Sequence, residues 1–196
     1  MQETTLLAAA RVFAAAITLA AFWLYNKQDG KISAGTWWIL ATGDSLDFAS
    51  YWEMTENWWK IAVPAAFAVA SIITFLYALA KKRFSWPDRT DLLIIGLDGV
   101  ITLGWWQQFA TATTANLLYQ ATAVMAFVPM YRGLYRNREK EVYAPWMLWS
   151  LAHFIFFITA AMEHESYAEL AYPLVGLLTH LAVIAFETKR RARYLV

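Results

Sequence analysis

The fold of this chain depends on one stretch, Thr36-Trp-Trp-Ile-Leu-Ala-Thr-Gly-Asp44-Ser-Leu-Asp47-Phe-Ala-Ser-Tyr-Trp52. Apart from two carboxylates, this stretch has nearly the length and apolar composition of a membrane span. The carboxylates count against a crossing, because ionisable groups are costly at bilayer depth. If it crosses, the chain spans the membrane seven times. If it does not, both the number of spans and the orientation change.

The composition of the whole chain is that of a membrane protein. Of its 196 residues, 60% are hydrophobic and 16% are charged, whereas soluble domains carry about 25% charged residues. The apolar residues form long runs, which indicates bilayer-spanning helices. We therefore predict an all-α integral membrane protein. The predicted spans are Leu6–Tyr25, Thr36–Trp52, Trp59–Ala80, Leu92–Gln108, Ala115–Leu134, Ala144–Met162 and Tyr167–Phe186.

The basic residues support a membrane crossing by the second stretch. With seven spans, 14 of the 16 lysines and arginines lie on one side, and only Arg11 and Lys60 lie on the other. Because cytoplasmic loops carry the excess of lysine and arginine, we predict the amino terminus outside and the carboxy terminus in the cytoplasm. The first residues contain no basic segment, which argues against a cleaved signal peptide. We expect the inner (plasma) membrane of a bacterium as the location.

The second and third spans can be aligned with the sixth and seventh at a constant offset of 109 residues. At this offset the span ends coincide without a gap, Trp37 matches Trp146, and Pro64 matches Pro173. The alignment predicts a three-helix repeat in residues 1–83, a connecting helix in 84–111 and a second three-helix repeat in 112–196. One repeat plus the connecting helix crosses the membrane four times, so both repeats have the same orientation, as in parallel-repeat transporters. The alternative is an accidental register between apolar helices.

One segment near the middle of the second repeat resembles a known motif. It reads Gln120-Ala-Thr-Ala-Val-Met-Ala-Phe-Val-Pro129-Met-Tyr-Arg-Gly-Leu-Tyr-Arg-Asn and is followed by a basic loop and Pro145-Trp146. This is similar to the PQ-loop pattern of the SWEET, PQ-loop and PnuC transporters, although Met130 stands where the motif has glutamine. The resemblance implies alternating-access transport of a small polar or aromatic solute, such as a vitamin precursor, nucleoside or sugar. Both uniport and proton-linked transport are open, and no cofactor is expected.

Polar and aromatic residues within the spans are the candidates for a solute site. At the offset of 109, Asp44 matches His153, so the two are predicted on opposite walls of one cavity, where they could exchange a proton. A structural hydrogen bond between helices is the alternative for this pair. Asp98, inside the fourth span, is a further candidate for proton coupling. The predicted binding residues are Trp37, Asp44, Asp47, Asn116, Gln120, Trp146, Trp149 and His153.

These residues also have structural interpretations. Aromatic side chains suit a ring-shaped solute, but they could equally anchor span ends or fill a core. Gln120 could bind a substrate amide or a neighbouring helix. Pro64 and Pro173 each remove a backbone hydrogen bond and are predicted hinges, although proline is also tolerated in the first turn of a helix.

Other functional classes fit less well. A non-catalytic structural or assembly subunit of a membrane complex is the main alternative to a transporter. A seven-helix hydrolase would need a zinc site, but the three histidines are predicted at different depths and lack HxxxH or HExxH spacing, so we expect neither a metal nor an enzyme. The absence of lysine between Tyr167 and Phe186 argues against a retinal pigment. The expected partners are the bilayer and a solute, and the chain could form a homo-oligomer; a net charge of only +1 gives no reason to expect nucleic acid.

Overall fold

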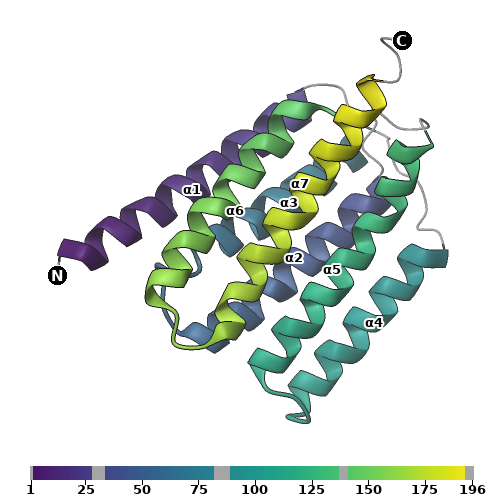
Figure 1. Ribbon diagram of the computed structural model, residues 1–196. Helices are drawn as coiled ribbons and strands as arrows, with labels where there is room; N and C mark the ends of the chain where they lie inside the picture. The colour runs from purple at the N-terminus through teal and green to yellow at the C-terminus, as the bar shows by residue number, and fades with distance from the viewer. Residues whose placement is uncertain (1, 28–33, 82–88, 137–140, 193–196) are drawn as a thin grey trace.

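The computed structural model describes residues 2–27, 34–81, 89–136 and 141–192. Within these ranges the chain is helical, without strands, and its long helices form one bundle (Figure 1). The helices are α1 (Gln2–Lys27), α2 (Ala34–Thr55), α3 (Ala62–Ala80), α4 (Arg89–Trp106), α5 (Ala112–Tyr135), α6 (Tyr143–Glu163), the short 3₁₀ helix η1 (Tyr167–Leu170) and α7 (Ala171–Ala192). Some basic residues of the charge count lie outside the described residues, namely Lys31, Lys82, Arg83, Arg138, Lys140 and Arg193.

Four segments have the length and apolar composition to cross a membrane: Thr5–Lys27, Ala62–Ala80, Tyr143–Glu163 and Tyr167–Ala192. Large apolar side chains on these helices also point outwards, and Phe13, Leu76 and Leu178 are each more than half exposed. Such a surface favours lipid over water. The chain is therefore an all-helical integral membrane protein. The described residues of α2, α4 and α5 do not meet the same combined measure of length and hydropathy.

The helix boundaries lie within about two turns of the predicted spans. The largest difference is at the end of α7, which continues to Ala192 although the predicted span ends at Phe186. The added turns carry a charged cluster in which Arg190 donates to Glu187 at 2.7 and 2.8 Å and Arg191 donates to it at 2.9 Å. Pairs spaced three and four residues apart lie on one helix face and stabilise it, so polar residues extend the helix beyond its apolar part.

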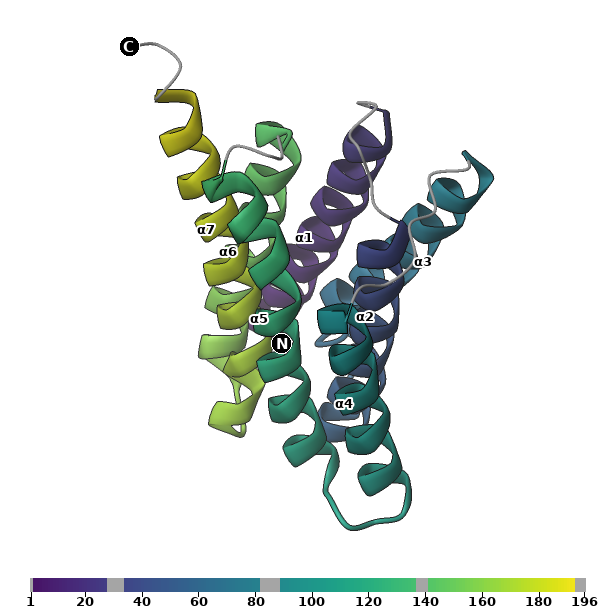
Figure 2. The ribbon, with the colours of Figure 1, turned by 90° about the vertical axis from the view of Figure 1, so that its right-hand side faces the viewer.

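The stretch with two carboxylates forms the continuous helix α2. It packs against α3, α4 and α5, so it lies among the other helices rather than along the outside of the bundle (Figures 1 and 2). Asp47 is only 3% exposed, and its Oδ1 accepts a 2.7 Å hydrogen bond from Gln120 Nε2. The cost of burying this carboxyl group is thus offset in part by a polar partner on a neighbouring helix.

The helices pack in two similar sets. Helices α1 and α2 both pack against α3, and in the same way α5 and α6 both pack against α7. Across the middle, α1 contacts α6 while α2 contacts α5, and α4 lies at the edge against α5 and α2. In Figure 2, α2–α4 and α5–α7 form two arms that diverge towards the end of the bundle where α7 ends.

At the opposite end of the bundle, one buried and one partly buried ion pair join the two sets of helices. Lys60 Nζ, just before α3, lies 2.8 Å from Glu169 Oε2 in η1, and both side chains are at most 5% exposed. Arg11 Nη1 in α1 lies 2.9 Å from Glu163 Oε2 in α6, and Arg11 Nη2 donates to the Thr159 carbonyl at 2.8 Å. Removing one partner of a buried pair typically costs about 3–5 kcal/mol, so these contacts hold this end of the bundle together.

Both candidate hinge prolines lie in the first turn of a helix. Pro64 follows two residues after the start of α3, and Pro173 follows two residues after the start of α7. Proline is tolerated there because the first turn has no backbone acceptor for its missing N–H. Their role as hinges stays a prediction.

Candidate functional site

A cavity lies in the middle of the bundle, between the two sets of helices. Its volume is about 560 Å³ when the open space that joins it to the outside is included. The volume open to the centre of a water-sized sphere is about 60 Å³, which is room for a few water molecules in this conformation. The lining comes from every long helix except α4: Phe22, Trp37, Leu40, Asp44, Asp47, Phe67, Gln120, Ala123, Phe127, Trp146, Trp149, His153, Tyr172, Val175, Gly176, Thr179 and His180.

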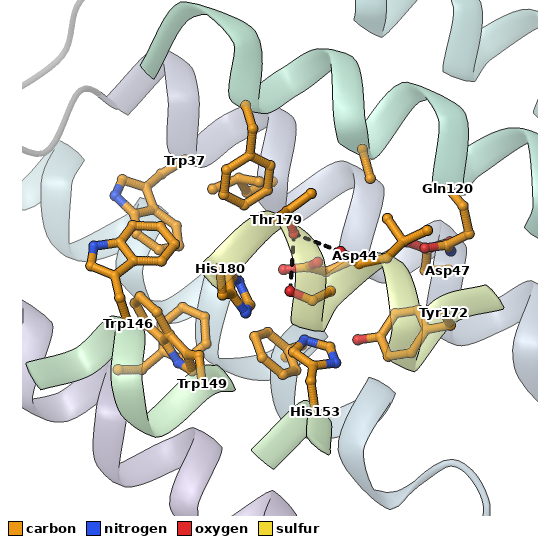
Figure 3. Close-up of a pocket in the computed structure, with 17 residues that line it drawn as sticks. Trp37, Asp44, Asp47, Gln120, Trp146, Trp149, His153, Tyr172, Thr179 and His180 are labelled. Atoms are coloured by element: carbon orange, nitrogen blue, oxygen red, sulfur yellow. Dashed lines mark hydrogen bonds between the residues drawn. The ribbon is translucent and has the colours of Figure 1, made fainter. Parts of the chain in front are cut away.

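The cavity has an aromatic end and a polar end. Figure 3 shows three tryptophans gathered at one end and two carboxylates at the other, with two histidines between them. The labelled residues of the aromatic end are Trp37, Trp146 and Trp149, and those of the polar end are Asp44, Asp47, Gln120 and Tyr172. The cavity wall therefore offers aromatic ring faces at one end and hydrogen-bonding groups at the other.

Edge-to-face contacts hold the aromatic end in place. The Phe22 ring centroid lies 4.7 Å from that of Trp149 and 5.5 Å from that of Trp37, and the Trp146 and Trp149 centroids are 4.8 Å apart. Such pairs contribute about 0.5–1.5 kcal/mol beyond the area they bury. All three tryptophans are at most 4% exposed. They face inwards, so they do not lie on the lipid-facing surface as membrane anchors would.

At the polar end, side chains of α5 are bonded to α2. Besides the bond from Gln120 to Asp47, Asn116 Nδ2 donates to Ser50 Oγ at 3.1 Å. Gln120 lines the cavity and at the same time bonds to a neighbouring helix. Asn116 is fully buried behind the wall and does not line the cavity. Asp44 does line it and is less buried than Asp47.

Two histidines form the centre of the wall built by α6 and α7. The sequence analysis predicted the histidines at different depths, but the ring centroids of His153 and His180 are only 5.0 Å apart. The two histidines lie at the same depth because α6 and α7 form a hairpin, in which residues equally far from the turn lie at the same level. Phe67 stacks on His153 with a centroid distance of 4.6 Å.

This wall contains buried polar atoms without hydrogen bonds. Within the described part of the chain, His153 Nδ1, His180 Nδ1 and Trp149 Nε1 have no partner. More than nine in ten buried polar groups in proteins are bonded to protein or water, and leaving one unsatisfied costs about 1–3 kcal/mol. These three atoms belong to residues that line one cavity, so the wall of α6 and α7 offers unused hydrogen-bonding groups there.

Gly176 is a cavity residue that the sequence analysis missed. A Cβ built on it would lie 2.6 Å from His153 Nδ1 and closer still to two other ring atoms. Any side chain at this position would therefore overlap the imidazole ring. The offset of 109 pairs Gly176 with Phe67. The matching of a glycine with a bulky aromatic residue is the sequence signal that could have identified Gly176 as a position where a side chain does not fit. Other missed lining residues are Phe22, Phe127, Tyr172 and Thr179.

Asp98 lies beside a second, smaller cavity between α2, α4 and α5. This cavity has an open volume of about 280 Å³ and is lined also by Asp44 and Asp47. Thr122 Oγ1 donates to Asp98 Oδ1 at 2.7 Å. The two cavities share the carboxylates of α2, while Asp98 itself does not line the larger one.

Among the residues that the structure describes, no three histidine, cysteine, aspartate or glutamate side chains are grouped so that they could hold a metal ion. The polar groups of the cavity can instead donate and accept hydrogen bonds. No protein-family model, curated protein or solved structure matches this chain.

Proposed function

We propose that the protein is a transporter that moves a small polar or aromatic solute across the membrane by alternating access. In this proposal all seven long helices span the bilayer, with the amino terminus outside and the carboxy terminus in the cytoplasm. Residues 1–83 and 112–196 are parallel three-helix repeats joined by the connecting helix in 84–111. The central cavity is the solute site, and it lies between the repeats, as in known parallel-repeat transporters.

The observation that carries this proposal is that the cavity is lined by counterpart residues of the two repeats. At the offset of 109, four pairs contribute both members to the lining: Trp37 with Trp146, Leu40 with Trp149, Asp44 with His153, and Phe67 with Gly176. The packing of α1 and α2 on α3 has its equivalent in the packing of α5 and α6 on α7. A duplication with a pseudo-twofold axis through the cavity explains both facts, whereas an accidental register explains neither.

The positions of the charges support the proposed orientation. Lys27, Lys81, Arg132 and Lys189 lie near the carboxy-terminal ends of α1, α3, α5 and α7, which are at one end of the bundle (Figure 2). The two basic residues assigned to the other side, Arg11 and Lys60, are the two that form the ion pairs between the repeats. The exposed positive charge thus faces the cytoplasm, and the ion pairs close the outer end in this conformation.

The polar groups of the cavity favour a solute with two different edges. The wall of α6 and α7 offers ring nitrogens of His153, His180 and Trp149, of which the indole N–H can only donate. The facing helix α2 offers the Asp44 carboxyl group, which accepts hydrogen bonds when ionised. A ring-shaped solute with an acceptor edge towards α6 and α7 and a hydroxyl or amine towards α2 would satisfy both walls. Vitamin precursors, nucleosides and sugars have such groups.

Uptake by purified protein in liposomes tests the proposal. A panel of radiolabelled vitamins, nucleosides, sugars and amino acids should identify a solute whose uptake falls strongly in the double variant Asp44→Asn with His153→Ala. Glu53→Gln with His164→Ala makes the same chemical changes outside the cavity and should leave uptake unchanged. Equal uptake by the two double variants would remove Asp44 and His153 from the mechanism. If the chain transports nothing but co-purifies with a fixed membrane partner, the assembly-subunit alternative is favoured.

Alternating access can be tested because the chain contains no cysteine. Ala123 lines the cavity on α5, so Ala123→Cys introduces a single thiol there. A membrane-impermeant thiol reagent should modify it from either side of the membrane in turn, and bound solute should protect it. Modification from neither side, with uptake intact, would contradict a solute path through this cavity.

A further inference from the structure

A groove distinct from both cavities described above lies between α1 and α3, on the outside of the bundle. Its open volume is about 810 Å³, again counted with the space outside it. Leu19 and Ile73 line it and are 47% and 55% exposed, so they face the surroundings rather than the core. Phe22 lines both this groove and the central cavity. The groove is therefore separated from the cavity by an aromatic side chain and is not part of the solute site.

The two rims of the groove carry the same order of side chains. On α1 the lining residues are Leu19, Trp23 and Lys27, spaced by four residues. On α3 the lining residues Ile73 and Tyr77 are followed at the same spacing by Lys81, which is exposed and lies beside the groove without lining it. Residues four apart lie on one face of a helix, and eight residues extend about 12 Å along the axis. Each rim therefore changes from apolar to aromatic to cationic towards the end of the bundle where α1 and α3 end.

The contacts at that end keep the charges beside the aromatic rings. Lys27 Nζ lies 4.9 Å from the Trp23 ring centroid, and Lys81 Nζ lies 5.6 Å from that of Tyr77. Asn26 also lines the groove; its Nδ2 donates to Thr74 on α3, but its Oδ1 accepts no hydrogen bond within the described residues. The mouth of the groove thus offers two cations and one acceptor that needs a donor.

We propose that this groove binds one anionic glycerophospholipid of the cytoplasmic leaflet. An acyl chain lies along Leu19 and Ile73, the ester region lies at the level of Trp23 and Tyr77, and the phosphate lies between the two lysines. A hydroxyl of the head group, as in phosphatidylglycerol, supplies the donor for Asn26. Basic pockets between transmembrane helices on the cytoplasmic side are known to bind anionic head groups. The charge of the mouth excludes a preference for neutral lipid.

Native mass spectrometry of the protein released from nanodiscs tests this proposal. The nanodiscs contain equal amounts of phosphatidylglycerol and phosphatidylcholine, and the measured quantity is the ratio of the two singly bound lipids. We expect wild-type protein to retain phosphatidylglycerol preferentially. Each of Lys27→Gln and Lys81→Gln should lower that ratio ~5-fold, because a lysine near the membrane surface contributes ~1 kcal/mol to the binding of anionic lipid.

Two further variants distinguish a bound lipid from general attraction to a basic surface. Lys189→Gln removes one charge at the same end of the bundle on α7, away from the groove, and should leave the ratio unchanged. Ile73→Trp fills the apolar part of the groove from an exposed position and should reduce retention of both lipids. An equal fall for Lys189→Gln, or equal retention of the two lipids by wild-type protein, would overturn the proposal. The measurement requires no transport, so its outcome is independent of the proposed transport activity; only the assignment to the cytoplasmic leaflet rests on the orientation proposed above.

Discussion

The central cavity depends on one position without a side chain, Gly176 in α7. Replacement by alanine places a Cβ 2.6 Å from His153 Nδ1 and even closer to Cε1 and Nε2 of the same ring. In real proteins a Cβ essentially never lies within 3.0 Å of a heavy atom from a residue that is not its neighbour in the chain. The imidazole must therefore move, but Phe67 stacks on it and His180 lies beside it, so it has little room to do so.

The expected magnitude follows from two opposing effects. Overpacking a tight interior costs about 1–3 kcal/mol. Alanine in place of glycine inside a helix contributes about 0.8–1 kcal/mol in the other direction. Gly96→Ala in α4 provides the matched control, because its Cβ would meet nothing within 4 Å. The difference between the two variants is then the overpacking cost alone, which corresponds to a Tm of Gly176→Ala about 2–12 °C below that of Gly96→Ala.

Thermal unfolding of the purified protein in one detergent, followed by tryptophan fluorescence, measures both variants. The double variant Gly176→Ala with His153→Ala removes the ring that the new methyl group strikes. The loss of stability in the double variant should therefore be smaller than the sum of the losses in the two single variants. The expected difference is about 0.5–3 kcal/mol, the range of coupling between residues in contact. Equal Tm values for Gly176→Ala and Gly96→Ala, or strictly additive effects in the double variant, would refute the reasoning.

Two further predictions concern polar contacts. Glu169→Gln should destabilise the protein by about 3–5 kcal/mol, because it leaves Lys60 buried beside a neutral partner. Glu165→Gln should cost less than about 1 kcal/mol, since Glu165 is 88% exposed and 3.6 Å from the same lysine; equal effects in urea unfolding would contradict the assigned burial. Thr122→Val should cost about 1.5–3 kcal/mol through loss of the 2.7 Å bond to Asp98, and an unchanged Tm would show that Asp98 has another partner.

Much of the secondary structure could be predicted from the sequence. Within the described residues, long apolar runs and short polar connections located the seven long helices but not the short helix η1, because the apolar run and its breakers are local properties of the chain. The end of α7 was the least accurate boundary, since charged pairs rather than apolar residues extend it. For the candidate site, the offset of 109 predicted that Asp44 and His153 line the same cavity, and both residues do line the central cavity.

The sequence by itself determined an all-helical membrane protein, the approximate helix ends and the segregation of basic residues, because hydropathy and charge act on each segment independently. The tertiary structure alone decided which polar side chains meet. Gln120 and Asn116 lie on one face of one helix, yet only Gln120 lines the cavity, while Asn116 bonds to Ser50 behind the wall. Likewise, His153 and His180 became neighbours through the α6–α7 hairpin, and Gly176 became essential only because a ring occupies the space beside it. Such contacts depend on how helices are rotated and paired, and that is set by the packing of the whole bundle rather than by any single segment.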